Sequence, residues 1–387
     1  MDIIYTQNAN LPLGVGHRRM CCVAHLDGWH SAWLTKDRGV LPYLFSRDYG
    51  FDSFLVGIRH PGEDYEGQLR YIPGVKLAFL PDASQETWLR FMEKNAATFD
   101  LLFLNGADMP YLPLVDTYKR LNPAGKVYLA TDMNSGWLDR IPWQRNDFQR
   151  FLGQCDVVGA SCRAMQRRIS QKWPCSPAYI PNGFFDYGVK REHVDFSSKE
   201  NIILTVGRIG TWQKDNETLV KAFAQVAASL PQWRLQMIGP AEEKFHQWLK
   251  KFLAENESLS GRIEMVGPVY DRAKLYACYG WAKIFALTSI FEGGNPNVTS
   301  EALAGGCAIV CSDIDAVQDI IADGGCGEHF KIGDVQALAG ILQSLCRDEE
   351  RLARYSRRAL AWSKENFDYP HIARRLHYLL FEENRGD

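Results

Sequence analysis

The chain has 387 residues, 46% of them hydrophobic, and a formal net charge of −2 at neutral pH. This length leaves room for about two domains, each large enough to bury its own core. A nearly neutral chain lacks the excess of cations that nucleic-acid binding needs, so a nucleic-acid partner is excluded. Ten cysteines at scattered spacings favour reduced thiols in a cytoplasm over a disulfide framework.

The first residues, MDIIYTQNANLPLG, contain no basic region followed by an apolar stretch, and no apolar run in the chain is long enough to span a bilayer. We therefore predict a cytoplasmic protein. Peripheral contact with the inner face of the membrane is the alternative, because CRAMQRRISQKWP brings four cations to near-helical spacing. A solvated helix face is the simpler interpretation of that segment.

Short apolar runs alternate with segments of helical period along the whole chain, which is typical of βαβ units and parallel sheets. We predict strands at residues 2–6, 51–58, 75–81, 101–106, 126–132, 156–161, 201–206, 233–239, 262–266, 283–288 and 307–311. The clearest helix spans residues 215–230, where apolar residues recur at Leu219, Phe223, Val226 and Leu230 and Asp215 stands at the capping position.

The first domain is expected to cover residues 1–185, where PNG and a polar stretch punctuate the chain, and the second to cover residues 186–368. A last apolar-periodic segment begins at Tyr369. We expect this C-terminal helix, within residues 369–387, to pack back on the first domain.

A glycine pair, Gly14 and Gly16, follows the first predicted strand and precedes His17. The pair either lets backbone approach a ligand closely or forms a plain turn from strand to helix. As a dinucleotide fingerprint it is incomplete, because Arg19 stands where a third glycine belongs, although Asp37 lies at the spacing of the expected acid. A dehydrogenase is therefore a weak alternative.

Asp132 ends the predicted strand at residues 126–132 and is followed by Asn and Ser. It either orients the hydroxyl of an acceptor or caps the next turn. Farther along the chain, Asp313 and Asp315 form a pair that looks like a metal site, but two carboxylates after a strand are weak evidence for one. We predict no bound metal.

Two pairs of charged residues in the second half of the chain each follow an apolar, strand-like run and precede a segment of helical period. Arg208 and Lys214 lie in VGRIGTWQKDNETLVKAF, and Glu292 and Glu301 lie in SIFEGGNPNVTSEALAGG. Each pair would project from the carboxyl edge of a parallel sheet, where α/β proteins bind ligands. Arginine forks and lysine point charges suit phosphates, whereas carboxylates repel phosphates and accept hydrogen bonds from sugar hydroxyls.

These two segments resemble the donor domain of the family 4 retaining glycosyltransferases of GT-B fold, a part of the glycosyl transferases group 1. The resemblance implies an α/β fold of two Rossmann-like parallel-sheet domains that face each other across a cleft. It implies that Arg208 and Lys214 hold the donor diphosphate, Glu301 the ribose and Glu292 the hydroxyls of the transferred sugar. The family has seven residues between its two glutamates, and this chain has eight, most simply through an extra residue in GGNPN.

Further donor contacts are expected from Gly293, Asn297 and Val298, in that loop and at the start of the following helix, whose positive end offers backbone N–H groups. By resemblance, Gly14, Gly16 and His17 would also lie beside the donor. The family often carries a histidine facing the acceptor where this chain has Asp132.

We therefore predict a metal-independent, retaining glycosyltransferase. It would move a sugar from a nucleotide-diphosphate sugar to a carbohydrate or glycolipid hydroxyl, in polysaccharide or glycoconjugate biosynthesis. The donor would bind mainly to the second domain and the acceptor to the first. Two alternatives stay open, namely another GT-B enzyme such as an epimerase or phosphorylase, and a non-catalytic sugar- or nucleotide-binding protein.

Overall fold

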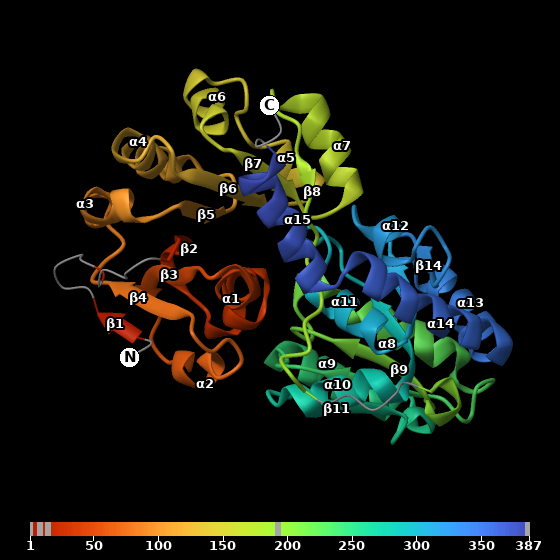
Figure 1. The fold of residues 1–387 in the computed structure, drawn as a ribbon. Helices are drawn as coiled ribbons and strands as arrows, with labels where there is room; N and C mark the ends of the chain where they lie inside the picture. Colours follow the sequence, from red (N-terminus) through yellow and green to blue (C-terminus); the bar gives the residue numbers. More distant parts are fainter. Residues whose placement is uncertain (1–2, 6–10, 12–16, 190–194, 384–387) are drawn as a thin grey trace. The chain divides into compact units, whose positions relative to one another are not determined.

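The computed structural model describes residues 3–5, 11, 17–189 and 195–383, and the chain forms two units (Figure 1). The first unit comprises residues 1–187 together with 369–387, and the second comprises residues 188–368. The boundary lies two residues after the predicted position at 185. Both units are built on parallel sheets covered by helices, so the predicted class of two Rossmann-like domains is confirmed.

The first unit is built on an eight-stranded sheet in which every described pairing is parallel. Its strand order is β1-β4-β3-β2-β5-β6-β7-β8. The strands are β1 (Ile3–Tyr5), β2 (Arg19–Trp29), β3 (Asp52–Arg59), β4 (Lys76–Leu80), β5 (Leu101–Asn105), β6 (Lys126–Thr131), β7 (Val157–Ala160) and β8 (Ala178–Tyr179).

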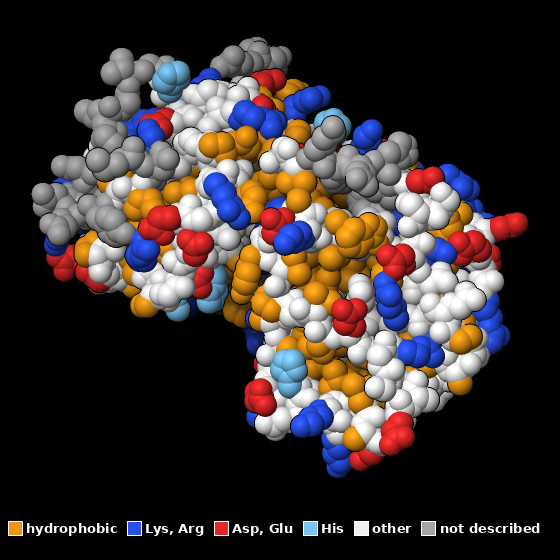
Figure 2. Space-filling view, turned by 90° about the horizontal axis from the view of Figure 1, so that it is seen from below, with side chains coloured by type: hydrophobic (Ala, Val, Ile, Leu, Met, Phe, Trp, Pro, Cys, Tyr) orange, Lys and Arg blue, Asp and Glu red, His pale blue; other side chains and the backbone are white. Residues whose placement is uncertain are grey.

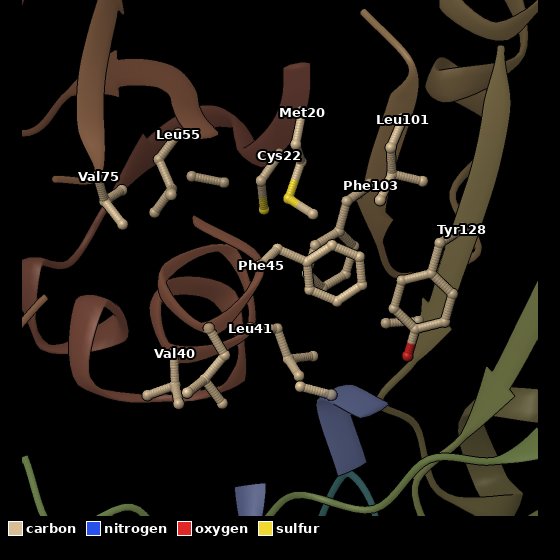
Figure 3. Packing of buried hydrophobic residues seen from close by; sticks show 14 of the residues in the cluster. Met20, Cys22, Val40, Leu41, Phe45, Leu55, Val75, Leu101, Phe103 and Tyr128 are labelled. Carbon is tan, nitrogen blue, oxygen red and sulfur yellow. The ribbon is translucent and has the colours of Figure 1, made fainter. Parts of the chain in front are cut away.

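Helices connect these strands and bury one face against them. They are α1 (Asp37–Tyr49), α2 (Tyr65–Leu69), α3 (Gln85–Asn95), α4 (Leu112–Leu121), α5 (Ser135–Leu138), α6 (Asn146–Gly153), α7 (Arg163–Lys172) and α15 (Tyr369–Phe381), with short 3-10 turns η1 (Ser31–Thr35), η2 (Ala96–Thr98) and η3 (Met109–Tyr111). Figure 3 shows α1 against this core, with the ring of Phe45 pointing toward Phe103 of β5.

The C-terminal helix α15 belongs to the first unit although 181 residues of the second unit precede it. Its Tyr369, Ile372 and Leu376 are buried in the core of the first unit, and the backbone N–H of Tyr369 donates to the carbonyl of Phe184. The apolar face of this helix therefore packs on the first unit, as its periodicity predicts.

Strand β2 was not predicted, and its presence corrects the interpretation of the glycine pair. Gly14 and Gly16 lie outside the described residues, but the element that follows them is a strand of eleven residues rather than a helix. β2 pairs with both β3 and β5 and lies in the middle of the sheet. The alternative of a turn from strand to helix therefore lacks the helix that it requires.

The second unit has a six-stranded sheet, again with all described pairings parallel, in the order β11-β10-β9-β12-β13-β14. The strands are β9 (Glu200–Val206), β10 (Arg234–Ile238), β11 (Ile263–Gly267), β12 (Ala282–Leu287), β13 (Ala308–Ser312) and β14 (Gly327–Phe330). The helices are α8 (Asn216–Ala227), α9 (Glu243–Glu255), α10 (Arg272–Trp281), α11 (Asn297–Ala304), α12 (Val317–Ile320), α13 (Val335–Cys346) and α14 (Glu349–Asn366), with turns η4 (Phe196–Ser198), η5 (Trp212–Lys214) and η6 (Glu257–Leu259).

Helix α8 confirms the predicted helix, since Leu219, Phe223, Val226 and Leu230 all lie in the core of the second unit. Asp215 occupies the N-cap position but makes no side-chain cap to the helix backbone. Instead, its carboxylate accepts a hydrogen bond of 2.7 Å from the hydroxyl of Thr218.

The face of the molecule in Figure 2 carries orange hydrophobic patches among blue and red side chains that are interspersed. On this face the described residues form no broad field of one charge sign.

Candidate functional site

The order of strands in the second unit places a topological switch point between β9 and β12. From β9 the chain proceeds to β10 and β11 on one side of the sheet and then crosses to β12 on the other side. The loops after β9 and β12 therefore diverge at the carboxyl edge, where open α/β sheets bind ligands. Arg208 and Lys214 lie in the first of these loops and Glu292 in the second.

The loop after β9 is held in one conformation by backbone contacts and a glycine. Ile209 is buried, and its N–H donates to the carbonyl of Pro240 at 2.8 Å. Gly210 has a φ of 81°, and its N–H donates to the side chain of Asn216 at 2.8 Å. Arg208 directly precedes these anchors and has an exposed side chain, so its guanidinium faces solvent.

Lys214 and Glu292 form a partly buried ion pair that joins the two loops. Their side chains are 14% and 10% exposed. The same carboxylate accepts a hydrogen bond of 2.5 Å from the hydroxyl of Ser289. Because two groups hold it, the carboxylate of Glu292 stays at the sheet edge despite the extra residue in the loop that follows.

Gln213 connects Arg208 to Phe291 and Glu292 in the loop after β12. Its Oε1 accepts from the guanidinium of Arg208 at 2.6 Å, and its Nε2 donates to the carbonyl of Phe291 at 2.9 Å and to Glu292 at 3.3 Å. Its backbone carbonyl accepts from the N–H of Ile290 at 2.8 Å. Arg208, Lys214 and Glu292 are thus brought together through one glutamine that the sequence analysis did not single out.

The segment GGNPN continues from Glu292 into helix α11. Asn295 is 1% exposed and bonds to two residues of the helix, donating to Ser300 and accepting from Thr299. Gly293 is half-buried in this loop, and Asn297 and Val298 are the first two residues of α11, with backbone N–H groups at its positive end. The loop is therefore fixed at both ends.

Glu301 lies farther along α11 and has partners of its own. The hydroxyl of Tyr279 donates to its Oε2 at 2.8 Å, and the guanidinium of Arg272 lies 3.4 Å from its Oε1. Both partners come from α10. Glu301, Tyr279 and Arg272 therefore form a second polar group, made by α10 and α11.

In the first unit, Asp132 follows β6 as predicted and is exposed. The amide of Asn182 donates to its Oδ1 at 3.4 Å. The helix that follows is capped by Asn134 and not by Asp132, since the Asn134 side chain accepts from the N–H of Trp137. Asp132 is therefore not the N-cap of α5.

His17 lies in a different place from the one expected. It is exposed and directly precedes β2, so it lies at the amino end of that strand. The ligand-binding edge of a parallel sheet is the carboxyl edge. The position of His17 therefore argues against its predicted contact with the donor. Gly14 and Gly16 lie outside the described residues.

Three ionisable residues that were not among the predicted site residues lie at the switch point of the first sheet, between β2 and β5. His25 lies near the carboxyl end of β2, Arg38 in α1, and Asp108 after β5. Burial and the nearby Arg38 lower the pKa of His25, and burial raises the pKa of Asp108. Only the tertiary structure could reveal this group, because its members are far apart in sequence.

The ring of His25 is held in one tautomer. The backbone N–H of Asp27 donates to its Nδ1 at 3.1 Å, so a neutral ring carries its proton on Nε2. The guanidinium of Arg38 stacks over Trp33 at 4.0 Å and donates to the carbonyl of Ala24 at 2.8 Å. A neutral histidine that donates from Nε2 can bind a hydroxyl oxygen.

Within the described residues, no group of three or more histidine, cysteine, aspartate or glutamate side chains has the arrangement of a metal site. Asp313 is exposed and Asp315 half-buried after β13. Across the part of the chain that the structure describes, no helix combines the length and apolar character needed to cross a membrane.

Residues 187–362, nearly the whole second unit, match the family model of the glycosyl transferases group 1. Among solved structures, the chain is similar to sucrose-phosphate synthase from Thermosynechococcus elongatus, with 17% identity, a TM-score of 0.70 and coverage of 94% of this chain and 98% of that one. Anabaena HepE in complex with UDP gives 17% identity, a TM-score of 0.71 and coverage of 93% and 98%.

Among curated proteins, the phosphatidyl-myo-inositol mannosyltransferase of Mycolicibacterium smegmatis is 26% identical over 157 residues, which cover 41% of this chain and 39% of the relative. An N-acetylgalactosaminyltransferase of Campylobacter jejuni, named for a diphospho-undecaprenol-linked acceptor, is 28% identical over 188 residues, 48% of each chain. The chain thus matches less than half the length of these relatives.

The two Rossmann-like units have the fold of the GT-B glycosyltransferases. The second unit is similar to the glycosyl transferases group 1 over residues 187–362. Membership of family 4 stays a prediction, since none of these matches names it.

Proposed function

We propose that this chain is a retaining glycosyltransferase that moves a sugar from a nucleotide-diphosphate sugar to a hydroxyl of a carbohydrate or glycolipid. The observation that carries the proposal is the linked set of Arg208, Gln213, Lys214 and Glu292 at the switch point between β9 and β12. It places two cations and a carboxylate within one hydrogen-bonded group. The UDP in the complex with Anabaena HepE supports a nucleotide donor of this kind.

In this proposal the cations stabilise the leaving group. Negative charge grows on the β-phosphate as the bond to the sugar breaks, and fixed positive groups aimed at it lower the barrier. The exposed guanidinium of Arg208 is available for two parallel contacts to phosphate oxygens. Lys214 supplies a second charge, which it would share between the phosphate and Glu292.

The remaining groups of the second unit then bind the rest of the donor. Glu292 accepts hydrogen bonds from hydroxyls of the transferred sugar, and Glu301, fixed by Tyr279 and Arg272, accepts them from the ribose. Backbone N–H groups of Gly293, Asn297 and Val298 add donors at the start of α11.

The first unit would bind the acceptor at the carboxyl edge of its own sheet. Asp132 after β6 and His25 near the end of β2 are the groups that we assign to the acceptor hydroxyl. Because the leaving phosphate itself can take the proton in a front-face reaction with retention, neither residue has to be a strong base. We propose that the reaction uses no metal, with the two cations in its place.

We further propose that the protein works in a cytoplasm and touches the membrane peripherally, in the synthesis of a polysaccharide or glycoconjugate. Four cations lie on α7, but Arg163 stacks on Tyr179 and Lys172 pairs with Asp139. Arg167 and Arg168 are exposed, and they are the pair that would meet anionic headgroups. The two curated relatives named for lipid-linked substrates support this choice.

The test is the release of free nucleoside diphosphate from a panel of UDP-, GDP- and ADP-sugars, with and without a panel of sugar and glycolipid acceptors. Transfer predicts release that depends on the acceptor. An epimerase would convert the sugar without releasing the diphosphate, a phosphorylase would require phosphate, and a binding protein would show affinity without turnover. Any of these three results would contradict the proposal.

A further inference from the structure

Two exposed aromatic side chains lie at the switch point of the second unit. Trp212 is 73% exposed and Phe291 is 37% exposed, and their ring centroids are 5.7 Å apart at an interplanar angle of 54°. Trp212 comes from the loop after β9 and Phe291 from the loop after β12. Large apolar rings that stay exposed on a folded protein commonly mark a binding surface.

The two rings are held in place by the same glutamine that links the charged residues. Nε2 of Gln213 donates to the carbonyl of Phe291, and the carbonyl of Gln213 accepts from Ile290. Trp212 directly precedes Gln213, and Phe291 directly precedes Glu292. The rings therefore keep a fixed position relative to the carboxylate of Glu292 and the ammonium of Lys214.

An aromatic face beside a fixed carboxylate and a cation has the chemistry that recognises a sugar ring. A pyranose presents an apolar face of C–H groups, which packs on an aromatic ring, and hydroxyls around its edge, which donate to a carboxylate. A lipid chain would need apolar surroundings without the carboxylate. A nucleobase would need its ring contact at the nucleotide end of the donor, whereas these rings adjoin the group assigned to the sugar.

We propose that Trp212 and Phe291 form a stacking subsite for a pyranose ring, with Gln213 as the positioning residue that aligns it with Glu292. The inference rests on the proposed function and extends it to residues that neither the family match nor the charged motif assigns. The ring that stacks is either the transferred sugar or the first sugar of the acceptor, and the experiment separates the two.

The experiment compares Trp212→Leu, which removes the ring, with Trp212→Phe, which keeps one. The matched control is Trp281→Leu, which replaces a Trp that is 53% exposed at the opposite, amino end of β12. For each variant, binding of the nucleoside diphosphate and of the nucleotide sugar is measured by calorimetry, together with the KM for the acceptor and kcat.

Stacking of the transferred sugar predicts that Trp212→Leu weakens nucleotide-sugar binding by about ten-fold, with nucleoside diphosphate binding unchanged. Stacking of the acceptor predicts a rise of the same size in the acceptor KM only. In either case Trp212→Phe restores most of the loss and Trp281→Leu behaves as the wild type. Phe291→Leu should give a loss in the same measurement as Trp212→Leu.

Unchanged sugar and acceptor binding in Trp212→Leu would overturn the inference while leaving the proposed function intact. Weaker binding of the nucleoside diphosphate alone would overturn it in favour of a nucleobase contact, and a loss confined to vesicle binding would overturn it in favour of a lipid contact. If the wild type binds no nucleoside diphosphate, the proposed function itself fails.

Discussion

Lys214 and Glu292 are 78 residues apart in the sequence, yet their side chains form an ion pair across the loops that follow β9 and β12. The hydroxyl of Thr288 donates to the backbone carbonyl of Lys214 at 2.8 Å and reinforces this contact. Because both charges are largely buried, the pair is part of the fold of the second unit as well as of the proposed site.

Removing one member of this pair should destabilise the protein more than removing both charges. Lys214→Met leaves the carboxylate of Glu292 without its cation, at a penalty of about 3 kcal/mol in the free energy of unfolding. Lys214→Met with Glu292→Gln should recover a large part of that loss. Urea unfolding of the two variants and the wild type measures this, and equal stability of the single and double variants would refute a coupled pair.

Gly210 should be needed for the loop that carries Arg208. Its φ of 81° favours glycine, and an added Cβ would lie 2.2 Å from Cβ of Phe245. Gly210→Ala should therefore shift the loop and weaken binding of a nucleoside diphosphate by about ten-fold, the equivalent of roughly 1.4 kcal/mol of strain.

Gly261→Ala is the matched control for this change. Gly261 has a similar φ of 73°, but an added Cβ there meets nothing within 4 Å, and the residue lies in the turn before β11. It should lower stability by about 1 kcal/mol without changing ligand binding. If Gly210→Ala and Gly261→Ala change ligand binding equally, the loop that carries Arg208 does not depend on glycine at position 210.

Lys199 should be a strong determinant of stability in the second unit. It is 6% exposed, and the carbonyl oxygens of Tyr279, Gly280, Ala282 and Gly305 surround its ammonium at 2.7 to 3.2 Å, within reach of its three N–H donors. Lys199→Met would leave these buried oxygens without a donor, which should lower the free energy of unfolding by about 3 kcal/mol. Thermal unfolding measures the loss, and a melting temperature within a degree of the wild type would contradict this role.

Alkaline pH should destabilise the fold through its buried thiols. Burial raises the pKa of Cys326 from 9.0 to about 12. Between these values the folded state retains a proton that the unfolded state releases, so stability falls as pH rises, by up to about 1.4 kcal/mol per pH unit for each such thiol.

Urea unfolding between pH 8 and pH 10 measures this dependence. Cys326→Ala should show a smaller fall than the wild type over the range in which the unfolded thiol titrates. A difference between the two proteins that does not change with pH would mean that the Cys326 thiol does not contribute.

The sequence allowed a large part of the second sheet to be predicted, because β9, β12 and β13 are rich in Ile, Leu, Val, Phe and Ala. Strand β2 was missed for two reasons. Its second half contains the polar residues His25 and Asp27, and the strand follows a glycine pair that is typical of a turn. That strand also carries the histidine at the switch point of the first sheet. The missed strand β2 therefore kept His25 out of the predicted site.

The charged residues of the site could be predicted because arginine, lysine and glutamate at the ends of apolar runs are unusual and chemically informative. Gln213 could not, since a glutamine in a loop is ordinary, and its role depends on a contact with Phe291, which lies 78 positions farther along the chain. The contact of Arg272 with Glu301 likewise needs α10 and α11 to pack together. Such partners follow from tertiary structure alone.

The most direct test of a donor site at the switch point is calorimetric binding of UDP, GDP and ADP to the wild type and to Arg208→Ala. Arg234→Ala is the matched control, since Arg234 begins β10 at the amino edge of the same sheet and pairs with Glu200. We predict that at least one nucleotide binds the wild type and Arg234→Ala alike, and binds Arg208→Ala about 100-fold more weakly. Wild-type affinity in Arg208→Ala, or no binding of any nucleotide to the wild type, would contradict the account.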